Sequence, residues 1–278
     1  MQLNCTIFTS FTGINRCLQP TWYFGNKTSA YICKLVEVDD ADVVANYKAH
    51  RLWQPIMKTV AILSRKGGAG KTTIALHLAV AVEKLGVSTA VFDLDPQASA
   101  CLWSDHRQEQ FPAVVPAQAP RLSGLLAQAR TKAAGLVILD TAPHADSIAS
   151  EAANHADTIL IPCRPSSLDL DAIGATIRLA RATNKPCYVV INAAPPQGVE
   201  TQEAQNGLTN AGVELSPVVL HQRKAFASWM HEGRTAQEMD PTCKAATEIN
   251  DLTKWLCNKM MLLPTKASNN RHKSVRSL

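Results

Sequence analysis

The feature that most constrains the fold is a glycine-rich segment at residues 64–73, Ser-Arg-Lys-Gly-Gly-Ala-Gly-Lys-Thr-Thr. It follows an apolar run at residues 59–63 and precedes an amphipathic stretch at residues 72–85. Glycines let backbone N–H groups close around an anion without side-chain clashes, and the N-terminus of a following helix adds further donors. The segment therefore predicts a strand, a phosphate-binding loop and a helix, in that order.

The residues of this loop have predicted roles toward a nucleoside triphosphate and its metal ion. Lys71 is expected to contact the β- and γ-phosphates, and the Thr72 hydroxyl to coordinate Mg²⁺. The alternatives are a glycine-rich turn without a ligand and a loop that binds nucleotide but has lost hydrolysis. We expect ATP and Mg²⁺ as cofactors, held by a cradle of Gly67, Gly68, Ala69, Gly70, Lys71, Thr72 and Thr73.

Short continuous apolar runs alternate with amphipathic stretches from Met57 onward. Continuous runs are typical of strands buried on both faces of a parallel sheet. Strand–helix alternation at this spacing predicts an α/β fold, a doubly wound, mostly parallel sheet with helices on both faces. The segment 111–120 is expected to be a loop or an irregular edge. The expected strands are residues 59–63, 89–92, 136–139, 158–161, 187–191 and 216–220.

Carboxylates follow two of these runs where each expected strand ends. Asp93 and Asp95 come after the run at 89–92, and Asp140 comes after the run at 136–139. The carboxyl ends of parallel strands lie at one edge of a sheet, beside the phosphate loop, where a metal ion and an attacking water would lie. Capping of a following helix is the alternative role for Asp93 and Asp95.

The motifs together resemble one superfamily. Arg65 stands where the usual phosphate-loop pattern has its first glycine, and Lys66 precedes two glycines to give KGGxGKTT. This is similar to the deviant Walker A motif of the ParA, MinD and nitrogenase iron protein superfamily of P-loop NTPases. With the motif Asp93-Leu94-Asp95-Pro96-Gln97, the chain resembles the small ParA partition ATPases over about residues 57–256.

The resemblance implies further roles for single residues. Lys66 would reach across an ATP-sandwiched dimer to the partner's phosphates, as an arginine finger does. Asp93 would support the Mg²⁺ shell, Asp95 would orient or activate the attacking water, and Asp140 would contact the metal through a bound water. Asn192, which ends the run at 187–191, would help to bind adenine.

The resemblance also implies a nucleotide-timed switch. ATP would close a homodimer, the dimer would bind DNA without sequence preference, and a ParB-like or small centromere-binding protein would stimulate slow hydrolysis and release. The cargo would be a plasmid or an integrative conjugative element. Arg223 and Lys224 are the candidate DNA contacts, because Lys and Arg supply salt-dependent phosphate binding; a solvated charged face is the alternative for each.

Two other functions remain open. One is an ATP-dependent recruitment scaffold in conjugative DNA transfer. The other is a MinD-like membrane-associated positioning ATPase, for which the apolar face Leu252, Trp255, Leu256, Met260 and Leu263 of the last expected helix, residues 245–262, could bind a membrane. We favour packing of that face on the core over membrane binding.

The two ends of the chain differ from the part between them. Residues 1–56 show no sustained period and are expected to be a poorly ordered extension, since a chain of this family would be expected to start at Met57. Residues 57–262 form the ATPase domain, and residues 263–278 are expected to be a basic disordered tail. The last twenty residues carry five Lys/Arg and no acid, which equals the net charge of +5. With no run of about 20 apolar residues, a cytoplasmic protein is expected. The DNA binding that the resemblance implies would make it nucleoid-associated.

Overall fold

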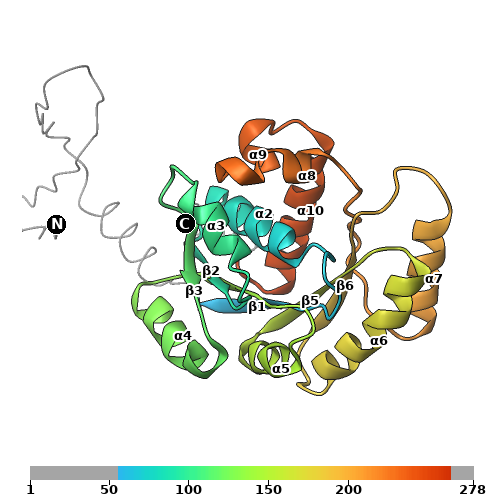
Figure 1. Cartoon of the computed structure of the whole chain (residues 1–278), viewed down its shortest axis with the longest axis horizontal. Coiled ribbons are helices and arrows are strands. Elements are labelled where there is room, and N and C mark those ends of the chain that lie inside the picture. The colour runs from blue at the N-terminus through green and yellow to red at the C-terminus, as the bar shows by residue number, and fades with distance from the viewer. Residues whose placement is uncertain (1–55, 264–278) are drawn as a thin grey trace, which may run out of the picture. The chain divides into compact units, whose positions relative to one another are not determined.

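A six-stranded parallel sheet forms the centre of the molecule (Figure 1). The computed structural model describes residues 56–263, so the expected N-terminal extension and basic tail lie outside the described residues except for their junctions at Ile56 and Leu263. The strand order is β3-β2-β4-β1-β5-β6, and every pairing is parallel. The strands are β1 (Lys58–Ile62), β2 (Thr89–Asp93), β3 (Ala113–Pro116), β4 (Leu136–Asp140), β5 (Thr158–Cys163) and β6 (Cys187–Ile191).

The strands are continuous apolar runs because both faces of the sheet are covered. Val60 and Ile62 of β1 point into one hydrophobic core, whereas Ala61 and the following Leu63 point into the other. All four are fully buried, as the period of two in a strand requires when helices pack on each side. The strand order places β4 between β1 and β2, so the carboxyl ends of these three strands lie side by side at one edge of the sheet.

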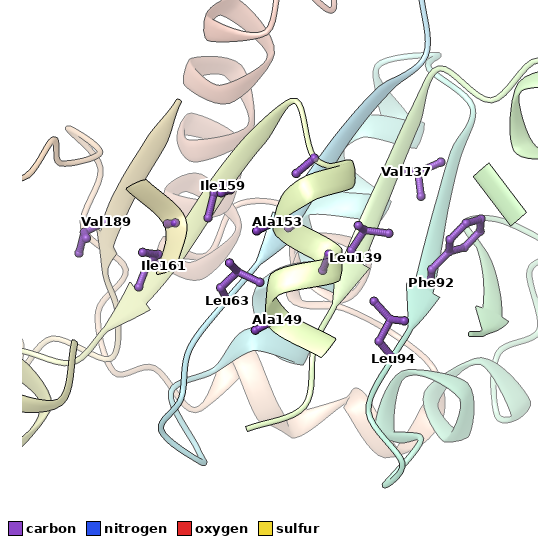
Figure 2. Close-up of a cluster of buried hydrophobic side chains, with 14 of the residues drawn as sticks. Leu63, Phe92, Leu94, Val137, Leu139, Ala149, Ala153, Ile159, Ile161 and Val189 are labelled. Carbon is purple, nitrogen blue, oxygen red and sulfur yellow. The ribbon is translucent and has the colours of Figure 1, made fainter. Parts of the chain in front are cut away.

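Helices cover both faces, so the predicted doubly wound α/β class is confirmed (Figure 1). On one face, α5 lies close to the sheet because it presents Ala149 and Ala153 toward Leu63 and Leu139 (Figure 2). That face carries α4 (Leu122–Thr131), α5 (Asp146–His155), α6 (Ser167–Arg181) and α7 (Glu200–Asn210), the last two toward β6. The other carries α2 (Lys71–Lys84), α3 (Ser99–Asp105), α8 (Ala225–Ser228), α9 (Ala236–Met239) and α10 (Lys244–Lys259), with short 3-10 turns η1 (Ala119–Arg121) and η2 (Met230–Glu232) elsewhere in the chain.

Two expectations about strands need correction. The run at 216–220 was predicted to be a strand and is not one; the isolated bridges Val189–Leu215 and Ala194–His221 lie on either side of it. The N–H groups of Ser216 and Leu220 donate to the carbonyls of Val189 and Ile191 in β6, but the N–H of Val218 between them donates to Ser216 Oγ at 3.1 Å, so the ladder is interrupted. The segment 111–120, expected to be a loop or irregular edge, contains the regular edge strand β3.

The apolar face of the last helix is buried, as the packing interpretation predicted. Leu252 and Leu256 of α10, and Met260 directly after it, are at most 5% exposed and belong to the core that also contains α2. Trp255 packs edge-on against Tyr188 of β6, with ring centroids 5.0 Å apart. No helix in the described part of the chain is both long enough and apolar enough to cross a membrane.

Candidate functional site

The glycine-rich segment forms the loop between β1 and α2, at the carboxyl edge of the sheet (Figure 1). It borders an open cavity of about 980 Å³. Gly68, Gly70, Lys71, Thr72 and Thr73 line one part of this cavity, together with Asp95. Another part is lined by Asn192, Pro195, Leu220 and residues 221–224. A cavity of this size and position fits a nucleotide in the crevice outside the strand ends.

Glycine is required at two points of the loop. Gly68 has φ +71° and Gly70 has φ +93°, in the left-handed region that other residues rarely adopt. A Cβ atom at Gly70 would also lie 2.3 Å from Asn192 Nδ2. The Asn192 amide donates to the Ala69 carbonyl at 2.7 Å, so it braces the loop from the end of β6. The structure therefore adds a contact with the phosphate loop to the predicted adenine role of Asn192, which stays a prediction.

Lys71 is buried inside the loop rather than extended into solvent. Its ammonium donates to the Ser64 carbonyl at 3.2 Å and to the Lys66 carbonyl at 3.5 Å. Burial lowers the pKa of Lys71, and the nearby carboxylates of Asp140 and Asp95 oppose that change. A cation held on the loop's own carbonyls is positioned to meet phosphates entering the same cradle.

Asp140 ends β4 as a buried carboxylate. It is 0% exposed, and within residues 56–263 neither carboxylate oxygen has a partner with full hydrogen-bond geometry. Burial raises the pKa of Asp140 to about 7; the Thr72 hydroxyl and Lys71 oppose the rise, while Asp93 and Asp95 add to it. An unpaired buried carboxylate is costly unless a cation compensates it. The orphaned oxygens beside Thr72 therefore fit a Mg²⁺ ion, which in nucleotide sites uses one or two protein ligands plus phosphates and water.

The other two predicted carboxylates differ in exposure and contacts. Asp93 is 3% exposed, and its Oδ2 accepts the backbone N–H groups of Ala100 and Cys101, each at 3.0 Å. Asp93 therefore caps α3, and capping was the alternative role considered for this residue. The sequence had not indicated a helix at α3. Asp95 is half-buried and lines the cavity, and its Oδ1 accepts the N–H of Gln97 at 2.9 Å.

Lys66 has a partner that the sequence reasoning missed. Its ammonium lies 2.8 Å from Oδ2 of Asp169 in the first turn of α6. The Lys66 side chain is 39% exposed and the Asp169 side chain 7%. The Ser166 hydroxyl also donates to Asp169, so the carboxylate is held by two groups. The only local signal was an acidic residue in the first turn after the β5 run, which is ordinary for any helix start.

Arg223 and Lys224, the candidate DNA contacts, both line the nucleotide cavity. The Arg223 guanidinium is paired with Glu248 of α10, with Nε 2.9 Å from Oε1. His221 donates from Nδ1 to the same carboxylate at 2.8 Å. Although burial raises the pKa of Glu248, the hydrogen bonds from Arg223 and His221 outweigh it, so the pKa is lowered. Lys224 is exposed.

The sequence matches known proteins over the segment that contains these site residues. Residues 60–236 match the model of the CobQ/CobB/MinD/ParA nucleotide binding domain. The maintenance of carboxysome distribution protein A of Halothiobacillus neapolitanus is 30% identical over 206 residues, which cover 70% of this chain and 94% of that protein. Protein ParA of Rhizobium radiobacter is 26% identical over 198 residues, covering 66% of this chain and 86% of that protein.

Solved structures agree in fold. The MinD cell division protein of Aquifex aeolicus superposes with a TM-score of 0.60 at 18% identity, over 72% of this chain and 97% of that chain. The septum site-determining protein MinD of Pyrococcus horikoshii, complexed with Mg-ADP, gives a TM-score of 0.58 at 17% identity, over 76% of this chain and 100% of that chain. Because the family model matches most of the described residues, the chain belongs to the CobQ/CobB/MinD/ParA family of nucleotide-binding proteins, with protein ParA of Rhizobium radiobacter among its relatives.

Proposed function

We propose that this protein is a slow ATP-hydrolysing switch that dimerises on ATP, binds DNA without sequence preference and drives the partition or maintenance of a plasmid or integrative conjugative element. One observation carries the proposal. Lys71, Thr72 and Asp95 line one edge of the cavity, and the buried carboxylate of Asp140 lies behind them, close enough to Thr72 and Lys71 for each to affect its pKa. A buried carboxylate beside a phosphate loop supports binding of a nucleotide with its metal ion, and Asp95 in the same cavity supports hydrolysis of that nucleotide.

Each residue has a separable task in this reaction. The loop glycines and Lys71 would hold the β- and γ-phosphates, and Thr72 with Asp140 would hold Mg²⁺. When bound, the metal ion supplies charge stabilisation for the transferring phosphoryl group. Asp95 faces the cavity and would orient the attacking water. Asp93, which already accepts three backbone N–H groups, supports this edge by fixing Asp95 and α3.

Lys66 would supply the dimer-dependent part of hydrolysis. In the chain described here its ammonium is paired with Asp169, at the rim of the phosphate loop. To reach a partner's phosphates it would have to leave that carboxylate, so we expect the exchange of this ion pair to accompany dimer closure. Unstimulated turnover would then be slow, on the order of 10⁻⁴ to 10⁻² per second, as in other P-loop switches.

The relatives named above support a role in partition or positioning of a cargo. One is named for maintaining carboxysome distribution and another is ParA. We expect a homodimer that binds DNA electrostatically and a small partner protein that stimulates hydrolysis, in a cytoplasmic, nucleoid-associated system. Lys224 is the better of the two candidate DNA contacts, because Arg223 is already paired with Glu248. The burial of the apolar face of α10 supports this function over MinD-like membrane binding.

The proposal is tested by measuring ATP hydrolysis and DNA retention together. The wild-type protein with MgATP should hydrolyse ATP slowly and should be retained on plasmid DNA, whereas the ADP-bound protein should not. Lys71→Ala removes the buried cation of the cradle and should abolish nucleotide binding and both activities. Equal DNA retention of the ATP and ADP states at low salt would refute the switch, and ATP-dependent flotation with liposomes would favour the membrane alternative.

A further inference from the structure

Arg164 lies at the nucleotide cavity but had no role in the sequence reasoning. It follows the last residue of β5 and precedes Pro165, at the same carboxyl edge as the phosphate loop. Its side chain is exposed and lines the cavity together with Gly68 and Gly70. The guanidinium Nη2 donates to the carbonyl of Gly68, and a Cβ atom at Gly68 would lie 3.7 Å from the same nitrogen.

The cations around the loop differ in how their charge is compensated. Arg65 lies 3.2 Å from Asp146, and Lys66 lies 2.8 Å from Asp169. Lys71 is buried near the carboxylates of Asp140 and Asp95. Among residues 56–263, Arg164 has no carboxylate within ion-pair distance. A full positive charge at the mouth of the cavity therefore has only a neutral carbonyl as its partner.

We propose that Arg164 is a phosphate-binding residue of the nucleotide site, which binds a phosphate oxygen while its hydrogen bond to Gly68 keeps it in place. This inference deepens the proposed ATPase function and rests on it. The ligand chemistry is a polyphosphate, because a guanidinium–phosphate contact is charge-assisted and directional. Lys66 is occupied by Asp169 in the single chain, so Arg164 supplies positive charge to the phosphates before any dimer forms.

The donor inventory of arginine supports both contacts at once. A guanidinium has five N–H donors in a rigid fork, and the Gly68 carbonyl accepts from only one of its nitrogens. The remaining donors are available to an anion in the cavity that Arg164 lines. A lysine at this position would keep the charge but not the fork, so it should bind phosphate less well than arginine and better than a neutral residue.

The competing interpretation is that Arg164 only supports the loop through Gly68. The two interpretations require different properties of the side chain at residue 164. Phosphate binding depends on its positive charge, whereas loop support depends only on a hydrogen-bond donor. Arg164→Gln removes the charge and keeps an amide donor, and Arg164→Lys keeps the charge. Arg130→Gln is the matched control, because Arg130 is an exposed arginine of α4 that does not line the cavity.

The test measures the Kd of MgADP and of magnesium with a non-hydrolysable ATP analogue by titration calorimetry. Arg164→Gln should weaken both by about tenfold, Arg164→Lys by about threefold, and Arg130→Gln by less than about twofold. The Kd of Arg164→Gln should also depend less on salt than that of the wild type, because one screened cation is missing. Thermal melting without nucleotide should show all variants folded, since both arginines are exposed.

Two results would overturn the inference. One is binding of both nucleotides by Arg164→Gln within about twofold of the wild type. The other is equal weakening by Arg164→Lys and Arg164→Gln, which would assign loop support instead. If the wild type binds MgATP and Lys71→Ala does not, the proposed function stands in either case. Failure of the wild type to bind any nucleotide would instead remove the proposed function and this inference together.

Discussion

His77 should make the stability of the protein depend on pH in a measurable way. It lies in α2 with 0% exposure. Its Nδ1 is 2.8 Å from the Thr73 carbonyl, so Nδ1 carries the proton and donates, and its Nε2 accepts the backbone N–H of Ala236 at 3.3 Å. Burial lowers the pKa of His77 from 6.5 to about 4, against smaller opposing effects of the Thr73 carbonyl and Glu238. The neutral ring thus connects the helix after the phosphate loop to α9.

The sign and size of the effect follow from proton linkage. The unfolded chain takes up the proton near pH 6.5 and the folded chain only near pH 4, so the stabilisation by neutral His77 is complete above about pH 6.5 and is lost as the pH falls toward 4. With about 1.4 kcal/mol per pKa unit, the loss is about 2 kcal/mol between pH 7 and pH 5 and about 3 kcal/mol by pH 4.

Urea denaturation of the wild type and of His77→Asn at pH 7 and pH 5 measures this directly. Asparagine can keep a donor toward Thr73 but does not titrate, so other acid-sensitive groups cancel in the comparison. The wild type should lose about 2 kcal/mol more than the variant over this range, whatever the variant's stability at pH 7. Parallel changes in the two proteins, within about 0.5 kcal/mol, would refute a neutral buried His77.

Further predictions concern the site and one ion pair. Lys66→Ala should bind nucleotide within about twofold of the wild type but lose dimer-dependent hydrolysis, and normal turnover would contradict the trans role. Asp95→Ala should accumulate as an ATP-bound dimer in size-exclusion chromatography, because the attacking water is no longer oriented. A monomer in the presence of MgATP would contradict this role of Asp95. Gly70→Ala should weaken nucleotide binding at least about tenfold because its Cβ meets the Asn192 amide, and adding Asn192→Ala should recover part of the loss. The Arg107 side chain is 4% exposed, and its Nη2 lies 2.7 Å from Oε1 of Glu238. Arg107→Ala should lower the free energy of unfolding in urea by about 3–5 kcal/mol, because it leaves the Glu238 carboxylate unpaired. A decrease below about 1 kcal/mol would show that the pair is not effectively buried.

Much of the architecture was predictable because it is encoded locally. A parallel strand with both faces covered is a short continuous apolar run, and the β1 and β6 runs were recognised on that basis. The run at 216–220 was apolar but was not a strand, because the Ser216 hydroxyl takes the N–H of Val218 and interrupts the pairing with β6 between Ser216 and Leu220. The short helix α3 was missed because seven residues are too few for a period, and Asp93 holds its start from another element.

By itself, the sequence determined the phosphate loop and the doubly wound α/β class, because a glycine-lined cradle and a buried strand are each built from consecutive residues. Only the tertiary structure decided the partners of the charged groups. Lys66 meets Asp169, Arg223 meets Glu248, and Arg164 meets the carbonyl of Gly68, with no ion-pair partner in the part of the chain that the structure describes. Which charges neutralise each other depends on which distant segments the sheet brings together, and no local pattern of residues carries that information.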